Sequence, residues 1–192
     1  MIFSEKNKEE KCIEIFSNNI CRAERHDVAL YLNALRKNDI ETLNEWERFG
    51  NSFRMILLNK KIYDRAALFG INDLKFNAGG LLECEKLYGL RKIDFVIQKR
   101  PYYSNYIEIG HGKNNTWAYG LSCSTATSGK GYRCDIWSEI YYSEKDAIQA
   151  GLEELMKWHC DMNHKDNFSK EIVKQIERKL KDLREPIQLE LF

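Results

Sequence analysis

Apolar residues recur at helical spacing over roughly the first third of the chain. The pattern predicts three helices and then a helical turn over residues 64–70. Asp39 is a suitable N-cap for the third helix. The apolar positions of the three helices, in chain order, are Ile13 and Phe16; Val28, Leu32 and Leu35; and Leu43, Trp46, Phe53 and Leu57. The region 1–70 is therefore predicted to be helical.

The spacing of apolar residues changes after a connector. Glycine and asparagine interrupt the short apolar runs of residues 71–92, which predicts a connector with one helix. Beyond it, β-branched and aromatic residues alternate with polar ones, as is typical of strands. The predicted strands are 93–98, 106–110, 116–124 and 131–137. Turn-forming residues separate them, so we expect a meander of three to four antiparallel strands.

Two amphipathic helices are predicted after the sheet. Ser143, with Asp146 three residues later, forms a capping-box-like start for the first, and Pro186 ends the second. Their apolar stripes are Ile148, Leu152, Leu155, Met156 and His159, and then Ile172, Ile176, Leu180 and Leu183. The order of helices, a small antiparallel sheet and two helices is typical of the α+β class.

The element pattern also predicts how the chain is organised. We expect a helical region, 1–70, to form one compact domain with a sheet-and-helix region, 71–185, followed by a tail, 186–192. A chain of 192 residues with 43% hydrophobic residues is long enough for one such domain and too short for several.

Charge and hydropathy exclude some classes of function. Thirty Lys and Arg residues against 29 Asp and Glu give a formal charge of +1, which argues against a protein that coats nucleic acid by its overall charge. A local basic face is still compatible with that balance. No apolar stretch is long enough to span a bilayer, and residues 1–11 carry charges where a signal peptide needs apolar residues. We expect a cytoplasmic protein without a membrane partner.

The residues that could support a metal site lack the spacing that zinc requires. His159 and Cys160 are adjacent on a predicted helix, with His164 nearby, and adjacent helical side chains point about 100° apart. A histidine satisfied by carbonyls at the end of the helix is the favoured interpretation. The six cysteines are scattered without a CxxC pair, which favours buried thiols in a reducing compartment. No metal or cofactor is predicted.

Nucleophilic catalysis is conceivable only on the predicted sheet. The candidate nucleophiles are Ser122, Cys123 and Ser124, and His111 would be their base. Asp135 or Glu108 would orient the histidine, but no G-x-S-x-G motif occurs. We therefore expect no catalytic residues and a protein that is not an enzyme. An enzyme acting on nucleic acid, through the hairpin face around His111, Asp135 and Glu139, is an alternative.

Basic and aromatic residues of the sheet suggest a second alternative, a nucleic-acid-binding protein. Lys113, Lys130 and Arg133 lie near the predicted turns and are the candidate phosphate contacts. Aromatic residues alternate along the strands, so at least half of them should belong to the core. The last helix carries Lys170, Lys174, Arg178, Lys181 and Arg184, but also Glu171, Glu177 and Asp182. Its mixed charge favours a solvated face.

The tail ends in large apolar side chains that something should cover. One explanation is an edge strand that folds back on the sheet, because residues 187, 189 and 191 alternate. In that case the protein would have a structural or regulatory role, with the tail completing its own fold.

The other explanation is a linear motif. The residues Gln188-Leu189-Glu190-Leu191-Phe192 resemble the bacterial sliding-clamp-binding pentapeptide, whose common form is Gln-Leu-Ser/Asp-Leu-Phe and which often stands at a C-terminus. Glu190 departs from that form but keeps an acidic group. The resemblance covers five residues. It implies that Gln188 hydrogen-bonds at the edge of a groove on the clamp, while Leu189, Leu191 and Phe192 fill its hydrophobic pocket.

The resemblance leads to an expected function. We expect a bacterial accessory protein that binds the DNA sliding clamp and acts in or regulates DNA replication or repair. The kinds of protein that carry this motif, together with the Lys- and Asn-rich composition, favour a phage or another mobile element as its source. The sliding clamp is the expected partner, and nucleic acid is a second candidate.

Overall fold

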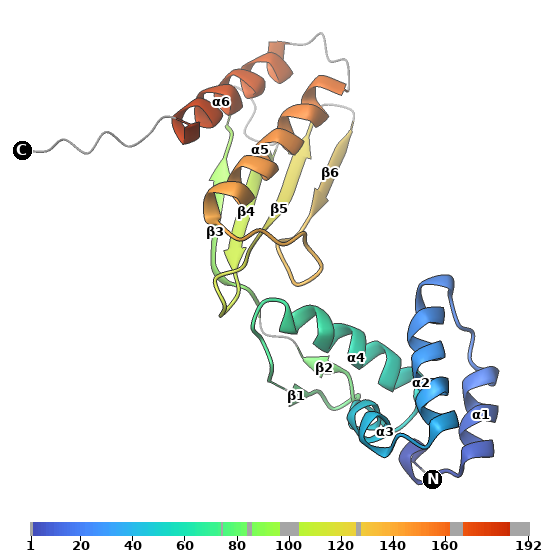
Figure 1. Ribbon diagram of the computed structural model, residues 1–192. Coiled ribbons are helices and arrows are strands. Elements are labelled where there is room, and N and C mark those ends of the chain that lie inside the picture. The colour runs from blue at the N-terminus through green and yellow to red at the C-terminus, as the bar shows by residue number, and fades with distance from the viewer. Residues whose placement is uncertain are drawn as a thin grey trace, which may run out of the picture. The chain divides into compact units, whose positions relative to one another are not determined.

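The computed structural model describes residues 2–73, 75–83, 86–96, 104–125, 128–161 and 167–184. The chain divides into two compact units, 1–85 and 86–192, which we call unit 1 and unit 2. Helices precede and follow small antiparallel sheets (Figure 1). The predicted α+β class is confirmed.

Unit 1 begins with helices. Their bounds are η1 Phe3–Glu5, α1 Lys8–Ser17, η2 Arg22–Glu24, α2 Arg25–Lys37, α3 Ile40–Glu47 and α4 Phe53–Ala67. Asp39 caps α3 as predicted, since its carboxylate accepts the backbone N–H of Thr42. The predicted third helix is in fact two helices, because the chain turns after α3 and Ser52 caps α4 by accepting the N–H of Met55. Gly50 permits this turn, where a Cβ would come within 2.6 Å of Met55 Cβ.

An aromatic cluster lies within the mainly aliphatic core of unit 1. Phe3, Tyr31 and Phe53 are fully buried and in mutual ring contact. On α1 the buried side chains are Ile15 and Lys11, whereas the predicted apolar residues of this helix, Ile13 and Phe16, are exposed. Burial of Lys11 is tolerated because its ammonium lies 2.7 Å from Glu47 Oε1, which also accepts the Tyr31 hydroxyl. The inward face of α1 therefore carries an ion-paired lysine beside the buried Ile15.

A hairpin follows α4, formed by β1 (Lys75–Phe76) and β2 (Leu82–Glu83). Within the described part of 71–92 no helix is present, so the helix predicted in this connector is wrong. Asn59 of α4 supplies what the hairpin needs: its fully buried amide donates to the carbonyls of Phe49 and Gly80 and accepts the N–H of Leu82. In a helix these backbone groups would pair with one another. Here the Asn59 side chain supplies their hydrogen bonds instead.

Unit 2 contains the predicted meander. Its strands are β3 Tyr88–Asp94, β4 Tyr106–His111, β5 Trp117–Ser124 and β6 Gly129–Tyr132. They pair antiparallel in the order β3-β4-β5-β6. The first and fourth strands begin and end earlier than predicted. β3 covers 88–94 rather than 93–98, and β6 ends at Tyr132 because residues 133–137 leave the sheet.

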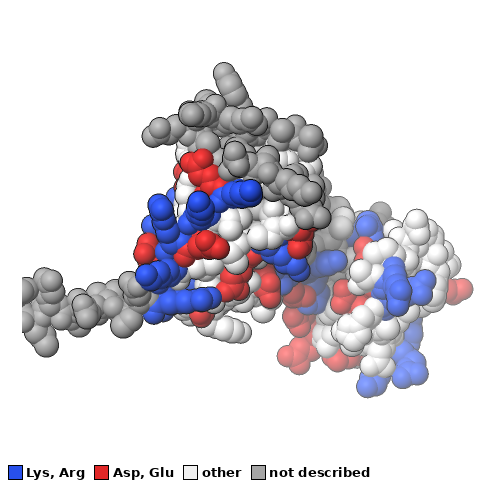
Figure 2. Space-filling model, turned by 90° about the horizontal axis from the view of Figure 1, so that it is seen from above, with Lys and Arg blue, Asp and Glu red and all other residues white. Residues whose placement is uncertain are grey.

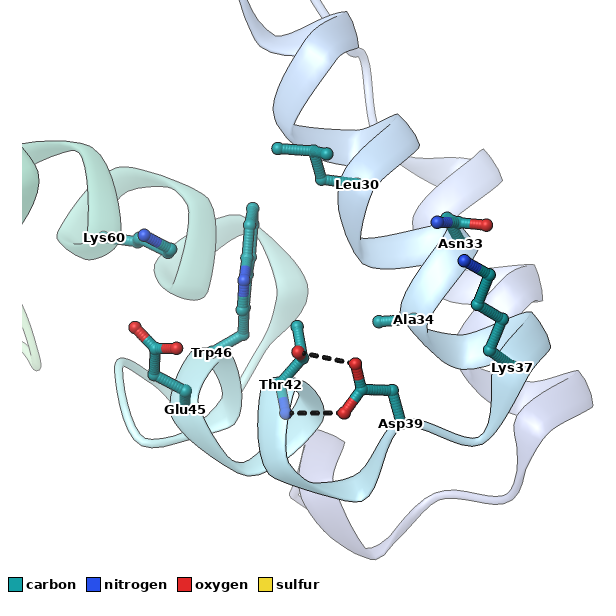
Figure 3. Close-up of a pocket in the computed structure, with 9 residues that line it drawn as sticks. All are labelled: Leu30, Asn33, Ala34, Lys37, Asp39, Thr42, Glu45, Trp46 and Lys60. Atoms are coloured by element: carbon teal, nitrogen blue, oxygen red, sulfur yellow. Dashed lines mark hydrogen bonds between the residues drawn. The ribbon is translucent and has the colours of Figure 1, made fainter.

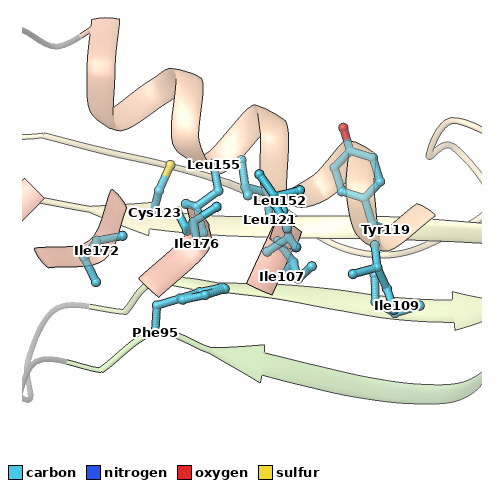
Figure 4. Close-up of a cluster of buried hydrophobic side chains, with 12 residues drawn as sticks. Phe95, Ile107, Ile109, Tyr119, Leu121, Cys123, Leu152, Leu155, Ile172 and Ile176 are labelled. Carbon is cyan, nitrogen blue, oxygen red and sulfur yellow. The ribbon is translucent and has the colours of Figure 1, made fainter. Parts of the chain in front are cut away.

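Two helices, α5 (Glu144–Asp161) and α6 (Asn167–Arg184), cover one face of this sheet (Figure 1). Ser143 caps α5 as predicted by accepting the N–H of Asp146. Side chains from strands and helices meet in one buried core (Figure 4). Its members are Phe95, Ile107, Ile109, Tyr119, Leu121, Cys123, Ile148, Leu152, Leu155, Ile172, Ile176 and Leu180. The apolar stripes predicted for both helices are therefore confirmed as core positions, with Met156 and Leu183 at the margin.

Replacement of Asn59 by alanine should destabilise unit 1. It would leave two carbonyls and one N–H without their partner, and we expect a loss of about 3 kcal/mol in the free energy of unfolding. Peptide-resolved hydrogen exchange would locate that loss to unit 1. Asn44→Ala, at an exposed position of α3, is the control and should change exchange little. Equal protection in both variants would contradict the role assigned to Asn59.

Candidate functional site

A cleft of about 390 Å³ opens in unit 2 beside the edge of the sheet. β5, β6, α5 and the segment 133–139 provide its walls. The residues that line it are Tyr119, Tyr132, Arg133, Asp135, Trp137, Ser138, Glu139 and Glu154. Trp137 and Tyr132 are exposed, whereas Tyr119 is buried. The cleft thus combines aromatic surface with charges of both signs.

Glu154 of α5 organises this cleft. Its Oε1 accepts a hydrogen bond from the Lys130 ammonium at 2.6 Å, and its Oε2 accepts the hydroxyls of Tyr119 at 2.6 Å and Tyr132 at 2.5 Å. Partial burial opposes the charged form, but the hydrogen bonds from Lys130 and the two tyrosines outweigh it and lower the pKa of the Glu154 carboxyl. Glu154 is therefore an ionised anchor that joins α5 to β5 and β6.

The groups around Glu154 are suited to binding rather than to acid–base chemistry. Burial, and then the hydrogen bond to Glu154, raises the pKa of Tyr119 and of Tyr132. Burial raises the pKa of the Cys123 thiol to about 11 and that of the Cys134 thiol, on the other face of the sheet, to about 12. At neutral pH these tyrosines are hydrogen-bond donors and both thiols are protonated, so neither type of group is an activated nucleophile.

The three predicted phosphate contacts are not together. Lys130 lies on β6 and is engaged by Glu154, and Arg133 lines the cleft. Lys113 lies in the turn between β4 and β5, with its ammonium 5.9 Å from the centre of the Tyr88 ring. Lys130 pairs with Cys123, six residues along β5 from Trp117, which adjoins that turn. Lys113 and Lys130 are therefore separated by about 20 Å of strand.

The predicted nucleophiles are equally far from their base. His111 pairs with Trp117 at one end of the sheet, and its Nδ1 lies 2.9 Å from the Gly112 carbonyl oxygen. Ser122 is about 17 Å further along β5, where its hydroxyl contacts Ser104. The alternative constellation of His111, Asp135 and Glu139 is also divided, because only the two carboxylates line the cleft.

A short segment crosses the face of the sheet opposite the helices. Cys134 donates its backbone N–H to Glu108 and its thiol to the carbonyl of Ala118. A Cβ on Gly120 would overlap the Cys134 backbone. The candidate orienting carboxylate Glu108 thus holds this segment in place. Trp117 and Tyr119, two of the aromatic residues that alternate along the strands, pack on the other, helix-covered face.

His159 has a structural environment. It is buried, with Nε2 3.0 Å from Asn105 Oδ1 and Nδ1 3.3 Å from the Ser169 hydroxyl. The Asn105 oxygen also accepts the N–H of Ser124, so His159 links α5 and α6 to the residue before β4 and, through it, to β5. These two partners are side chains, whereas the sequence led us to expect carbonyls at the end of the helix.

Other chemical candidates add no site. Cys160 is exposed, whereas His164 lies outside the described residues. The described part of the chain has no group of three or more His, Cys, Asp or Glu residues arranged to hold a metal ion. The motif residues Gln188, Leu189, Leu191 and Phe192 also lie outside the described ranges.

Unit 1 has a cleft of about 330 Å³ of a different character (Figure 3). Its lining comes from α2, α3 and α4, with the Trp46 indole on one side and Lys37 on the other (Figure 3). Asp39 accepts a hydrogen bond from the Thr42 hydroxyl. The Lys60 ammonium donates to Asp64 and lies over the Trp46 ring. These internal pairings leave few polar groups to orient a ligand.

Sequence patterning does not single out Glu154. It is one of several carboxylates on α5, and only the pairing of β5 with β6 brings Tyr119 and Tyr132 beneath it.

No helix in the described ranges is both long enough and apolar enough to cross a membrane. Comparison of the chain with protein-family models, curated proteins and solved structures finds no match.

Replacement of Glu154 by glutamine should destabilise unit 2 in a pH-dependent way. We expect a loss of about 2 kcal/mol at pH 7, because three hydrogen bonds to a charged acceptor are weakened. Since the folded-state pKa is lowered from 4.5, the stabilisation is present above that value and is lost as pH falls through the folded-state pKa. Urea unfolding of both forms at pH 7 and below pH 4.5 would measure this.

Glu153→Gln is the matched control, since Glu153 is the exposed neighbour on the same helix. It should change stability at pH 7 by less than about 0.5 kcal/mol. A difference between wild type and Glu154→Gln that stays constant with pH would refute the assigned ionisation.

Proposed function

We propose that this protein binds the bacterial DNA sliding clamp through residues 188–192 and acts in or regulates DNA replication or repair. The observation that carries the proposal is the match of Gln188, Leu189, Leu191 and Phe192 to the clamp-binding pentapeptide. Three apolar side chains would enter a preformed hydrophobic pocket, and the glutamine amide would fix their orientation by hydrogen bonding. A short segment of this kind can give a specific contact without a large folded interface.

The core of unit 2 supports this use of the motif. Described residues of β4, β5, α5 and α6 already bury the helix side of the sheet, and Leu152, Leu155, Ile172 and Ile176 there are fully buried. The apolar residues of 188–192 are therefore not needed to cover that side. A partner can therefore bury Leu191 and Phe192, and the stability measurement below separates this from a strand added at the edge of the sheet.

The motif is closely tethered to unit 2. Helix α6 ends at Arg184, four residues before Gln188. Even a fully extended chain spans at most about 14 Å over that interval. A clamp bound to the motif would accordingly lie next to the end of α6, and unit 2 would be held at the surface of the clamp.

Truncation of the motif's anchors should weaken clamp binding strongly. For Leu191→Ala/Phe192→Ala we expect at least about a 30-fold loss of affinity, because buried anchors dominate such contacts. Calorimetry or surface plasmon resonance with a purified bacterial clamp would measure it. Glu190→Ala, at the position that varies in the family motif, is the matched control and should lose less than about fivefold.

Thermal stability separates the proposal from its alternative. If Leu191 and Phe192 complete the core, their truncation should lower the melting temperature by several degrees, since 1 kcal/mol corresponds to about 4–8 °C in a unit of this size. On our proposal the melting temperature stays within about 1 °C of wild type. Absence of clamp binding by the wild-type chain would refute the proposal directly.

A further inference from the structure

The exposed side of α6 is predominantly basic. Six basic side chains are exposed on this helix, against three acidic ones. The basic ones are Lys170, Lys174, Arg178, Lys179, Lys181 and Arg184, and the acidic ones are Glu171, Glu177 and Asp182. Figure 2 shows the blue side chains gathered over this part of unit 2, with red ones among them. The mixed charge of this helix favours a solvated face when it is considered from the sequence alone. On the folded helix, however, most of the basic residues lie on one side.

Five of the six basic residues share one face. At 100° per residue, Lys170, Lys174, Arg178, Lys181 and Arg184 fall within about 120° of the helix circumference. We call these five residues the α6 stripe. Glu177 lies within it, Glu171 and Asp182 lie beyond one margin, and Lys179 lies well outside. The stripe is about 21 Å long.

Packing fixes the direction in which the α6 stripe faces. Ile172, Ile176 and Leu180 are buried in the core, on the side of the helix opposite the stripe. The side chain of Gln175 donates to the carbonyl of Val96, which holds α6 against the sheet. Rotation of the helix would expose the buried residues, so the stripe is a constant feature of the surface.

Within the described residues, acidic groups of neighbouring elements leave Lys170, Lys174 and Arg178 without an ion pair. Arg184 lies 3.9 Å from Glu153 of α5, and both side chains are exposed, so the pair is screened by solvent. Lys181 also has a partner, so among the described residues the unpaired charge of the stripe rests on Lys170, Lys174 and Arg178. The stripe retains positive potential even though the whole chain has a formal charge of only +1.

We propose that the α6 stripe binds the phosphate backbone of duplex DNA. A duplex carries one negative charge per about 1.7 Å of its axis, so a 21 Å stripe can neutralise several phosphates. The choice of DNA rests on the proposed function, because a sliding clamp encircles duplex DNA and the stripe ends four residues before the motif. Lysine and arginine on one helix face contact phosphates without reading base edges, so binding is independent of sequence.

The test is DNA binding by the full chain without the clamp. Fluorescence anisotropy with a labelled duplex, between about 50 and 200 mM salt, gives affinity and salt slope. For Lys174→Glu/Arg178→Glu we expect at least about a tenfold loss and a salt slope smaller by about 2. Glu177→Gln should increase affinity about threefold, because it removes the acidic group within the stripe. Damage to folding would not produce such a gain.

Lys179→Glu is the matched control, because it makes the same charge change on the same helix outside the stripe. We expect its affinity for duplex DNA to stay within about twofold of that of the wild type. Lys174→Glu alone should lose about fivefold or more. Equal losses in these two single variants, no measurable DNA binding by the wild type, or tighter binding to duplex RNA of the same sequence would overturn the proposal.

The two proposals fail separately. Leu191→Ala/Phe192→Ala should bind duplex DNA as the wild type does, and Lys174→Glu/Arg178→Glu should still bind the clamp in the absence of DNA. DNA binding without clamp binding would support the proposal for the α6 stripe and refute the proposed function. Clamp binding without DNA binding would refute only the stripe.

Discussion

Burial of one face of the four-stranded sheet under α5 and α6 is the constraint on which unit 2 depends. The two-residue period of β4 and β5 places Ile107, Ile109 and Leu121 on that face, and the helices meet them with Leu152 and Ile176. This packing fixes the rotation of both helices. It thereby determines that Glu154 reaches Tyr119 and Tyr132, and that the charged side of α6 faces solvent. Surface chemistry in this unit follows from its core.

Local patterns could predict much of the fold because they reflect local energetics. The caps Asp39 and Ser143 bond to residues three positions away, and the apolar face of α5 that includes Leu152 follows from spacing along one helix. Long-range pairing is what the sequence could not reveal. Lys11 is buried because Glu47 lies opposite it, and Glu154 matters because β6 returns beside β5. The candidate nucleophiles and phosphate contacts were separated for the same reason, since strand register decides which end of the sheet each occupies.

Recognition in this protein is proposed to be divided between two simple elements. Residues 188–192 would supply specificity through a few apolar anchors, while the α6 stripe would add salt-dependent attraction without sequence preference. Each contribution alone can be modest, because a short tether raises the effective concentration of the second contact once the first has formed. A chain with almost balanced charge is compatible with this division, since it avoids binding nucleic acid through its whole surface.

The distribution of thiols has a practical consequence. Cys123 and Cys134 are buried, whereas Cys21 and Cys160 are exposed, one in each unit. Maleimide dyes react with accessible thiolates, so these two natural positions can carry a donor and an acceptor once Cys12 and Cys84 are replaced by serine. Energy transfer between the dyes would then report the spacing of the two units in solution, and whether it changes when a partner binds.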